Sequence, residues 1–489
     1  MGDDEGDAAL ERLLAWSLAR GVRVDVERVE VRASSSGRRG RGPRVAHRGV
    51  FAKRAIASDA STDVIVIPRS CMIACEEGGT ERRRDAGGGS TDARDELALL
   101  LLRHRSNGSS DAFAPYVASM PTSYNLLQSW TEEEIEELQD SRAKSLARRR
   151  RDETLAAFRR VRERVRELIG HGASEDEAFA AFEWARATVS SWAVSVPFHA
   201  AGALCPMGDM FNYAPHDPPV LINVIGSPTF GARGDDGDDA IAGKEIELAR
   251  DTNSTSAVAT GTAPIPGDGA YDSAAETFAF RTAVQPDGRR GVDAGEEIFV
   301  CYGEYSNLEL LDYYGFTLAP DENPQDYYVL DVRVDADDDR VIPLKVFVGG
   351  FSWNDLADVR IAFATKRGYV KNEKELRDVA RRGGALGEES ELETFTAIRD
   401  TAAEALLGFP TTAKMDIETL QEMESSAFPR ENVALAVAWR LGAKRILQRA
   451  YKWADARVAE IDAVRDAAAR ASRVTLARVS MPKPRPRAR

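Results

Sequence analysis

The sequence predicts an α+β protein with more than one domain, and three observations support this prediction. The 489 residues exceed what one hydrophobic core usually organises. Apolar residues make up 43% of the chain, which is enough for a sizeable core. Strand-like alternation falls in two stretches, about 22–67 and 276–302, whereas helical periodicity fills 92–196 and dominates from about 343 onward.

The N-terminal region is expected to form a helix followed by a small sheet. Residues 8–20 place leucines and a tryptophan mostly at helical spacing, and the valines between 22 and 31 then turn toward strand-like alternation. Two β-rich runs follow, HRGVFAKRAI at 47–56 and DVIVIPRSCMIA at 63–74. The turn-like SDAST separates these two runs, so we expect them to form separate strands.

The region 92–196 is predicted to be mainly helical. Within it, Thr131 and Glu134 match a capping box, in which the hydroxyl and the carboxylate each satisfy an unpaired backbone N–H at the start of a helix. The basic run from Arg148 to Arg151 lies in a segment whose apolar residues recur every three or four positions. We therefore interpret this run as the solvated face of an amphipathic helix, in preference to a binding patch.

Residues 226–275 are rich in Gly, Ser, Thr and Asp and poor in large apolar side chains, so this stretch is predicted to be a disordered insertion loop. Order resumes with ETFAFRT at 276–282 and EEIFVCYG at 296–303, which are expected to pair as a hairpin across an Asp-Gly turn. Ser306 and Glu309 then match a second capping box, which predicts a short helix ending before Gly315.

Composition and charge exclude several classes of function. The formal net charge of −14 disfavours direct binding to nucleic acid or to an anionic membrane, because both need a basic footprint. No run approaches the roughly 20 apolar residues that span a bilayer. The acidic start lacks the features of a targeting peptide, so a cytoplasmic or nuclear location is expected, with a plastid less favoured. The four cysteines are too few and too scattered to predict disulfides or a metal site.

Three segments in order resemble the SET-domain methyltransferases, in the branch that contains RuBisCO large-subunit methyltransferase. They are HRGVFAKRAI with VIVIPRS, then LCPMGDMFNYAP, then GEEIFVCYGEYSNLELLDYYGFTLAPDENPQD. ENVALAVAWRLGAKRIL additionally resembles the C-terminal substrate-binding domain of that branch. The likeness runs from about residue 10 to about residue 460, and it is the order of several fragments that makes it specific.

The resemblance implies a SET-domain β-fold with a helical insertion and an all-α C-terminal domain. The SET domain would occupy 1–325, with its helical insertion at about 92–190. A helical substrate-binding domain would occupy 326–470 and a basic tail 471–489. In such a fold the segments around Asn212 and Tyr302 pack side by side in a threaded arrangement, which brings distant residues into one site.

The resemblance also implies an activity, the transfer of a methyl group from S-adenosylmethionine to a lysine of a non-histone protein. Tyr302 matches the catalytic tyrosine, and Tyr314 matches a second aromatic residue of the site. Asp209 is expected either to line the lysine channel or to support the loop that carries Asn212. A desolvated aromatic channel suits this reaction, because burial favours the neutral amine over the ammonium.

The cofactor is expected to contact a further set of residues that match the motifs of the family. The loop at the first motif would present backbone groups, with Gly49 allowing close approach. Asn212 would meet the amino-acid end of the cofactor through its side-chain amide, which is both a donor and an acceptor. The implied cofactor-binding residues are Arg48, Gly49, Val50, Asn212, Tyr213 and Phe316.

Three positions depart from the family pattern. The chain has His47-Arg48-Gly49 in place of Gly-x-Gly, and Asn212-Tyr213 in place of Asn-His. Trp192 aligns with an arginine that in relatives steers the cofactor carboxylate, and a tryptophan offers one N–H and no charge. These departures motivate the alternative of a catalytically weak or silent module that binds proteins. Methylation of histidine is a second alternative, and a monomer with a protein substrate is expected in each case.

Overall fold

The fold is described from a computed structural model of the chain. The structure describes residues 3–34, 48–57, 61–75, 92–215, 221–222, 267–283, 291–335, 341–368, 373–381, 384–425 and 430–479. Its contacts divide the chain into two compact units. The first comprises Met1–Asp217, Val258–Asp326 and Thr411–Gly442, and the second comprises Pro218–Ala257, Tyr327–Pro410 and Ala443–Arg489.

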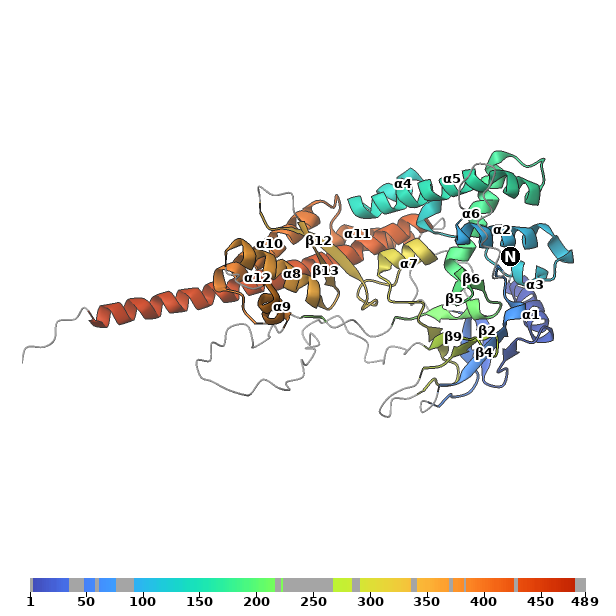
Figure 1. The fold of residues 1–489 in the computed structure, drawn as a ribbon, viewed down its shortest axis with the longest axis horizontal. Coiled ribbons are helices and arrows are strands. Elements are labelled where there is room, and N and C mark those ends of the chain that lie inside the picture. The colour runs from blue at the N-terminus through green and yellow to red at the C-terminus, as the bar shows by residue number, and fades with distance from the viewer. Residues whose placement is uncertain are drawn as a thin grey trace, which may run out of the picture. The chain divides into compact units, whose positions relative to one another are not determined.

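Small sheets form the β part of the first unit (Figure 1). One sheet has the order β1-β4-β10-β9, a second has the order β2-β3-β11-β7, and β5 pairs with β6. The strands are β1 (Arg23–Val24), β2 (Val29–Ala33), β3 (Arg48–Ala52), β4 (Asp63–Pro68), β5 (Ala193–Val196), β6 (His199–Leu204), β7 (Asn212–Tyr213), β9 (Asp268–Asp272), β10 (Thr277–Arg281) and β11 (Glu297–Val300). Helix α1 (Asp3–Ala19) precedes them, so the predicted helix that leads into a sheet is confirmed.

A helical insertion lies between the sheet strands of the first unit, as the sequence predicts. Its helices are α2 (Ala93–Ser106), α3 (Ala114–Val117), α4 (Glu132–Glu136), α5 (Ser141–Ile169) and α6 (Glu175–Trp192). Helices α2, α5 and α6 pack on one another (Figure 1). The capping box of Thr131 and Glu134 is present at the start of α4, and Ser174 with Glu177 forms another at α6.

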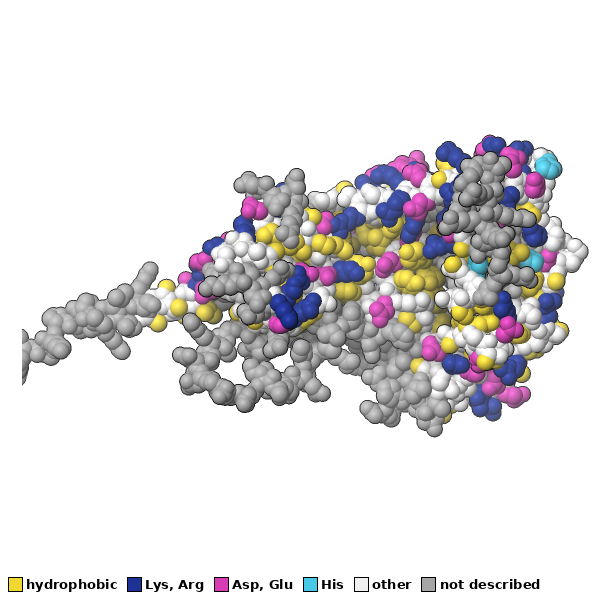
Figure 2. All heavy atoms as spheres, in the orientation of Figure 1, with side chains coloured by type: hydrophobic (Ala, Val, Ile, Leu, Met, Phe, Trp, Pro, Cys, Tyr) yellow, Lys and Arg dark blue, Asp and Glu magenta, His cyan; other side chains and the backbone are white. Residues whose placement is uncertain are grey.

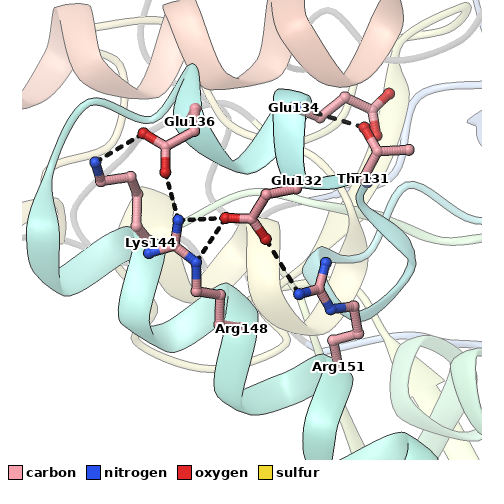
Figure 3. A network of polar contacts seen from close by, with 7 residues as sticks. All are labelled: Thr131, Glu132, Glu134, Glu136, Lys144, Arg148 and Arg151. Carbon is pink, nitrogen blue, oxygen red and sulfur yellow. Dashed lines mark hydrogen bonds and ion pairs between the residues drawn. The ribbon is translucent and has the colours of Figure 1, made fainter.

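The basic run on α5 is only partly the solvated face that the sequence predicts. Arg148 and Arg151 bind carboxylates of α4, including Glu132, at the surface (Figure 3). Figure 2 shows basic and acidic side chains intermixed along α4 and α5. Arg150 differs, because its guanidinium is directed to the buried Asp312. The prediction of a purely solvated run is therefore wrong at one position, which periodicity alone could not single out.

The predicted hairpin between 276–282 and 296–303 is also wrong. Strand β10 pairs with β4 and β9, whereas β11 pairs with β3 and β7 in a different sheet. Each strand satisfies its backbone groups on strands that are distant in sequence, which a local turn signal cannot reveal. The loop expected at 226–275 falls mostly outside the described residues. Its end is corrected, since Asp268–Asp272 forms β9 and pairs with β10.

The second unit is mostly helical but not all-α, which corrects that part of the predicted fold class. It contains β12 (Tyr327–Arg333), β13 (Val341–Phe347) and β14 (Gly350–Ser352), joined with β8 (Leu221–Ile222) in the order β12-β13-β14-β8. In β12 Leu330 and Val332 are buried, and in β13 Leu344 and Val346 are buried, with an exposed residue between the two in each strand. This period-two pattern of β-branched and apolar residues forms a half-buried sheet.

The helices of the C-terminal half are shared between the two units. Helices α8 (Trp353–Lys366), α9 (Glu373–Arg381) and α10 (Glu388–Leu407) lie in the second unit. Helix α11 (Ala413–Glu424) and the first part of α12 (Glu431–Val479) belong to the first, although the sequence assigns this segment to the C-terminal domain. The buried Arg440 explains the difference, because it binds Asp416 of α11 and Glu137 beside α4. Within the described residues, no helix is long and apolar enough to cross a bilayer.

Candidate active site

The segments around Asn212 and Tyr302 lie side by side, as the resemblance implies. Strands β7 and β11 pair in parallel, with Phe299 opposite Asn212 and Val300 opposite Tyr213. Directly after β11, the Tyr302 hydroxyl donates a hydrogen bond of 2.6 Å to the carbonyl of Phe211, 91 positions away in the sequence. This short parallel pair therefore holds the predicted catalytic tyrosine next to the predicted cofactor-binding asparagine.

Four aromatic rings form a closed circle at this point. The ring centroids are 4.9 Å apart for Tyr302 and Tyr314, 6.2 Å for Tyr314 and Phe316, 6.1 Å for Phe316 and Tyr213, and 5.3 Å for Tyr213 and Tyr302. These are the separations of interacting aromatic pairs. The structure thus brings together four of the side chains that the sequence singled out, and they provide an apolar, aromatic surface.

A fifth aromatic residue, Tyr305, was not foreseen from the sequence. Its ring lies 5.6 Å from that of Tyr314 and 5.7 Å from that of Tyr313. Gly303 permits this position, because it adopts a φ of +148° and a Cβ there would lie 2.7 Å from the Tyr305 ring. The density of tyrosines between 302 and 314 was the available signal, but only the turn at Gly303 directs this one to the site.

Tyr213, where the family has a histidine, has a defined structural partner. Its hydroxyl donates a hydrogen bond of 3.2 Å to the carbonyl of Gly303, in the turn that follows Tyr302. Burial raises the pKa of Tyr213 well above its ordinary value, and burial raises that of Tyr314 as well. Both phenols therefore stay neutral and act as hydrogen-bonding groups at physiological pH.

The predicted cofactor end of the site centres on Asn212. Its side-chain amide donates one hydrogen bond of 2.7 Å to the carbonyl of Arg48 and another to the Glu297 carboxylate. A Cβ at Gly49 would overlap that carboxylate and approach Asn212 Nδ2 to 3.0 Å. Gly49 is therefore required for this arrangement, whereas the close approach to the cofactor that the resemblance implies for it stays a prediction. Glu297 was not singled out, and only the strand pairing reveals it.

For the other described residues that the sequence singled out, the structure gives no side-chain hydrogen bond to Asn212. Val50 is fully buried in the main core, between β2 and β11, so its side chain packs in the interior. Its proposed contact with a cofactor stays a prediction for its backbone. Trp192 ends α6, and its half-buried ring packs against the same core. His47 lies outside the described residues.

Asp209 lies on the short 3-10 helix Gly208–Met210, where the residue is partly buried and both of its carboxylate oxygens are buried. Neither of its carboxylate oxygens has a hydrogen bond of normal geometry within the described residues, and the same holds for the nearby Tyr116 hydroxyl. Burial raises the pKa of Asp209 to about 7, while the Tyr116 hydroxyl and Arg48 act in the opposite direction. A carboxyl group with such a pKa changes its protonation in the physiological range, which is common at functional sites.

Helix α7 (Asn307–Tyr314) is held in place from two directions. Arg150 of α5 donates three hydrogen bonds of 2.7 to 3.0 Å to the Asp312 carboxylate, and the Ser191 hydroxyl donates to the carbonyl of Tyr313. The predicted capping box starts the helix, and Gly315 ends it with a φ of +74°. Because Tyr314 is the last residue of this helix, these contacts determine where its ring lies.

Comparisons with known proteins agree with this architecture. The Rubisco LSMT substrate-binding family matches residues 335–447. A curated relative, Protein SET DOMAIN GROUP 40 of Arabidopsis thaliana, is 26% identical over 333 residues, which are 66% of this chain and 62% of the relative.

Solved structures resemble the whole fold. The SET domain of LSMT bound to lysine and AdoHcy and Rubisco LSMT bound to AdoMet each have a TM-score of 0.58 and 18% identity, over 93% of both chains. The fold, the matched C-terminal family and the SET-domain relative together make the chain similar to the Rubisco LSMT-like SET-domain proteins, as the motifs in the sequence imply.

Proposed function

We propose that the chain is an S-adenosylmethionine-dependent methyltransferase that modifies a lysine side chain of a non-histone protein. The fold supports a SET methyltransferase of the LSMT type, and the solved relatives are described as bound to AdoMet, AdoHcy or lysine. The match to a substrate-binding family supports a protein as the acceptor. The acidic composition makes a basic protein a better partner than nucleic acid.

The residues at the cofactor end fit an amino-acid group. Gly49 leaves room beside Asn212, and Asn212 is flanked by Arg48 and by the Glu297 carboxylate. The Glu297 carboxylate can pair with the ammonium of that group, and the Arg48 side chain, whose charge lowers the pKa of Asp209, is the candidate partner for its carboxylate. When bound, S-adenosylmethionine supplies an electrophilic methyl group on a sulfonium.

The aromatic circle can prepare the acceptor nitrogen. An ammonium has no lone pair with which to attack, and a desolvated environment lowers the pKa of an amine. Tyr302, Tyr314, Phe316 and Tyr213 provide such an environment. They also constrain the direction from which a side chain enters, and orientation is the main requirement of an in-line displacement.

The observation on which the proposal depends is the position of the Tyr302 hydroxyl. It donates its proton to the carbonyl of Phe211, so its oxygen can only accept from any further partner. An acceptor beside Asn212 is suited to hold an amine N–H and to contact a polarised methyl group through C–H···O interactions. Both roles require Tyr302 to lie where the parallel pair of β7 and β11 places it.

The test is transfer of labelled methyl from S-adenosylmethionine to proteins of a cell extract. The unaltered chain is expected to label a protein, and Tyr302→Phe is expected to slow labelling by about 10²-fold, as is usual for a lost catalytic group. Tyr313→Phe is the matched control, because Tyr313 lies on α7 outside the aromatic circle. Equal rates for the two variants would contradict the role of Tyr302.

Two further results separate the alternatives. Amino-acid analysis of the labelled product distinguishes methyl-lysine from methyl-histidine. Calorimetry with S-adenosylmethionine tests the silent module, for which Trp192 and Tyr213 are the motivating departures. Absence of binding heat, together with absence of labelling, would replace the enzymatic proposal with a protein-binding function.

A further inference from the structure

We propose that the carboxylate of Glu297 binds the α-ammonium group of S-adenosylmethionine and so takes part in cofactor recognition. The inference rests on the proposed function and adds a residue of the third motif to which the sequence analysis gave no role. Glu297 is the first residue of β11, where it pairs with Phe51 of β3. Its carboxylate lies against Asn212 and Gly49, two of the residues that the sequence assigned to the cofactor.

The hydrogen bonds of Asn212 determine which ligand group this end of the site can hold. A primary amide has two N–H donors and one carbonyl acceptor. Both donors of Asn212 are used, one for the carbonyl of Arg48 and one for Glu297. The remaining group of this side chain is its Oδ1 acceptor. Asn212 can therefore receive a hydrogen bond from an ammonium, but it cannot donate one to a carboxylate.

Glu297 adds a negative charge to that acceptor. Its Oε2 accepts a hydrogen bond of 2.9 Å from the Ser34 hydroxyl, and its Oε1 accepts from Asn212. These contacts fix the orientation of the carboxylate before a ligand arrives, which lowers the entropy lost on binding. A carboxylate next to an amide carbonyl forms a pair of acceptors suited to a group with three N–H donors.

The carboxylate of S-adenosylmethionine needs a cationic partner, which neither Asn212 nor Glu297 provides. Trp192 supplies no cation, whereas Arg48 on β3, whose backbone carbonyl accepts a hydrogen bond from Asn212, carries one. Its charge reaches this region, because it lowers the pKa of the buried Asp209 carboxyl. The Glu297 carboxylate contacts Asn212 directly, whereas Arg48 contacts it through its backbone carbonyl, so we expect Glu297 to pair with the ammonium and the Arg48 side chain to meet the carboxylate of S-adenosylmethionine. We expect Arg48 to supply the cation that Trp192 does not.

The experiment is calorimetry of the full chain with three ligands. They are S-adenosylhomocysteine, its analogue without the amino group, and 5′-methylthioadenosine, which lacks the whole amino-acid end. Glu297→Gln is expected to lower the affinity of the chain for S-adenosylhomocysteine by about 10- to 100-fold, which is the range for the loss of a hydrogen bond to a charged group. Its affinity for the other two ligands is expected to stay within about twofold of that of the unaltered chain.

Two variants make the result specific. Glu296→Gln is the matched control, because Glu296 is the adjacent carboxylate and instead accepts a hydrogen bond from the backbone of Asp293. It is expected to leave all three affinities unchanged. Glu297→Asp keeps the charge on a shorter stem and is expected to retain part of the preference for the amino group. Unchanged binding of 5′-methylthioadenosine shows that the altered site is folded.

The outcomes separate this inference from the proposed function. The unaltered chain is first shown to bind S-adenosylhomocysteine. If Glu297→Gln then lowers the affinity for this ligand by no more than it lowers the affinity for the analogue without the amino group, Glu297 does not recognise the ammonium. The proposed function would then stand without this inference. If the unaltered chain binds neither S-adenosylmethionine nor S-adenosylhomocysteine, both are overturned.

Discussion

At the scale of single residues, the site combines groups that are costly to bury with groups that need burial to act. The carboxylate of Asp209 has no normal hydrogen bond within the described residues, yet it lies inside the fold near Tyr116 and Tyr124. Tyr314 and Tyr213, by contrast, are neutral phenols whose burial only strengthens their neutrality. Among these three groups, Asp209 is therefore the one whose pKa burial moves into the physiological range.

Asp209 leads to a prediction about stability and pH. Its carboxyl pKa rises from 3.8 in the ordinary state to about 7 in the folded chain, so the folded state binds a proton more tightly. The stabilisation from the protonated form is complete below about pH 4 and is lost as pH rises through about 7. At roughly 1.4 kcal/mol per pKa unit, this loss is on the order of 4 kcal/mol.

Asp209→Asn removes this titration and keeps the shape of the side chain. The stability of the variant relative to the unaltered chain is therefore expected to increase between pH 4 and pH 8. Urea unfolding at a series of pH values measures the difference. A constant difference across that range would mean that the carboxyl group is not held in an environment that favours protonation.

At the scale of elements, the helical insertion positions the aromatic site through α5 and α7. The Asp312 side chain is only 4% exposed, and Arg150 binds it bidentately, so this pair links two helices that are distant in sequence. Burial raises the pKa of Asp312, and Arg150 lowers it. Arg148 and Arg151 bind carboxylates of α4 at the surface (Figure 3), and Arg149 pairs with Glu153 of its own helix.

Arg150→Met is expected to destabilise the first unit by about 2 kcal/mol, because it leaves the Asp312 carboxylate buried without its cation. The value is below that of a fully buried pair, since Arg150 is 26% exposed. Methyl transfer should also slow, because Tyr314 follows Asp312 by two residues. Arg148→Met, on the same helix, should change stability by less than about 1 kcal/mol. Thermal unfolding of both variants tests this, and equal losses would show that Arg150 is an ordinary surface arginine.

At the scale of the whole molecule, each unit has polar contacts of its own in its interior. In the second unit, Arg360 and Glu391 are almost fully buried and share three hydrogen bonds of 2.6 to 3.1 Å. Arg360 also donates to the carbonyls of Ala380 and Gly384. This pair ties α8, α9 and α10 together. In the first unit, Arg440 and Asp416 play the corresponding part for α11 and α12.

Arg360→Met is expected to lower the free energy of unfolding of the second unit by about 3–5 kcal/mol, because it leaves Glu391 buried without a partner of opposite charge. Its affinity for S-adenosylhomocysteine should not change, since the proposed cofactor residues all lie in the first unit. Arg367→Met is the control, because Arg367 forms exposed ion pairs with Glu389 and Glu393. A large change in ligand affinity for Arg360→Met alone would show that the two units are coupled.

Several features of the fold follow from signals that act over a few residues. The capping boxes at Thr131 and Ser306 and the stop at Gly315 are correct because the groups involved lie within one helical turn. The α+β class and the helical insertion follow from periodicity in the same way. The candidate residues Tyr302 and Asn212 came from motif resemblance, and the structure places them together.

The sequence by itself determined the positions of most helices, the class of the fold and the segments that build the site. Only the tertiary structure decided that β11 pairs with β3 and β7 and not with β10, that Arg150 faces Asp312, that β12 and β13 interrupt a helical region, and that Glu297 meets Asn212. The physical reason is the separation along the sequence of the residues that interact. Caps and periodicity depend on neighbours in the chain, whereas strand partners and buried charges depend on residues that folding brings from far away.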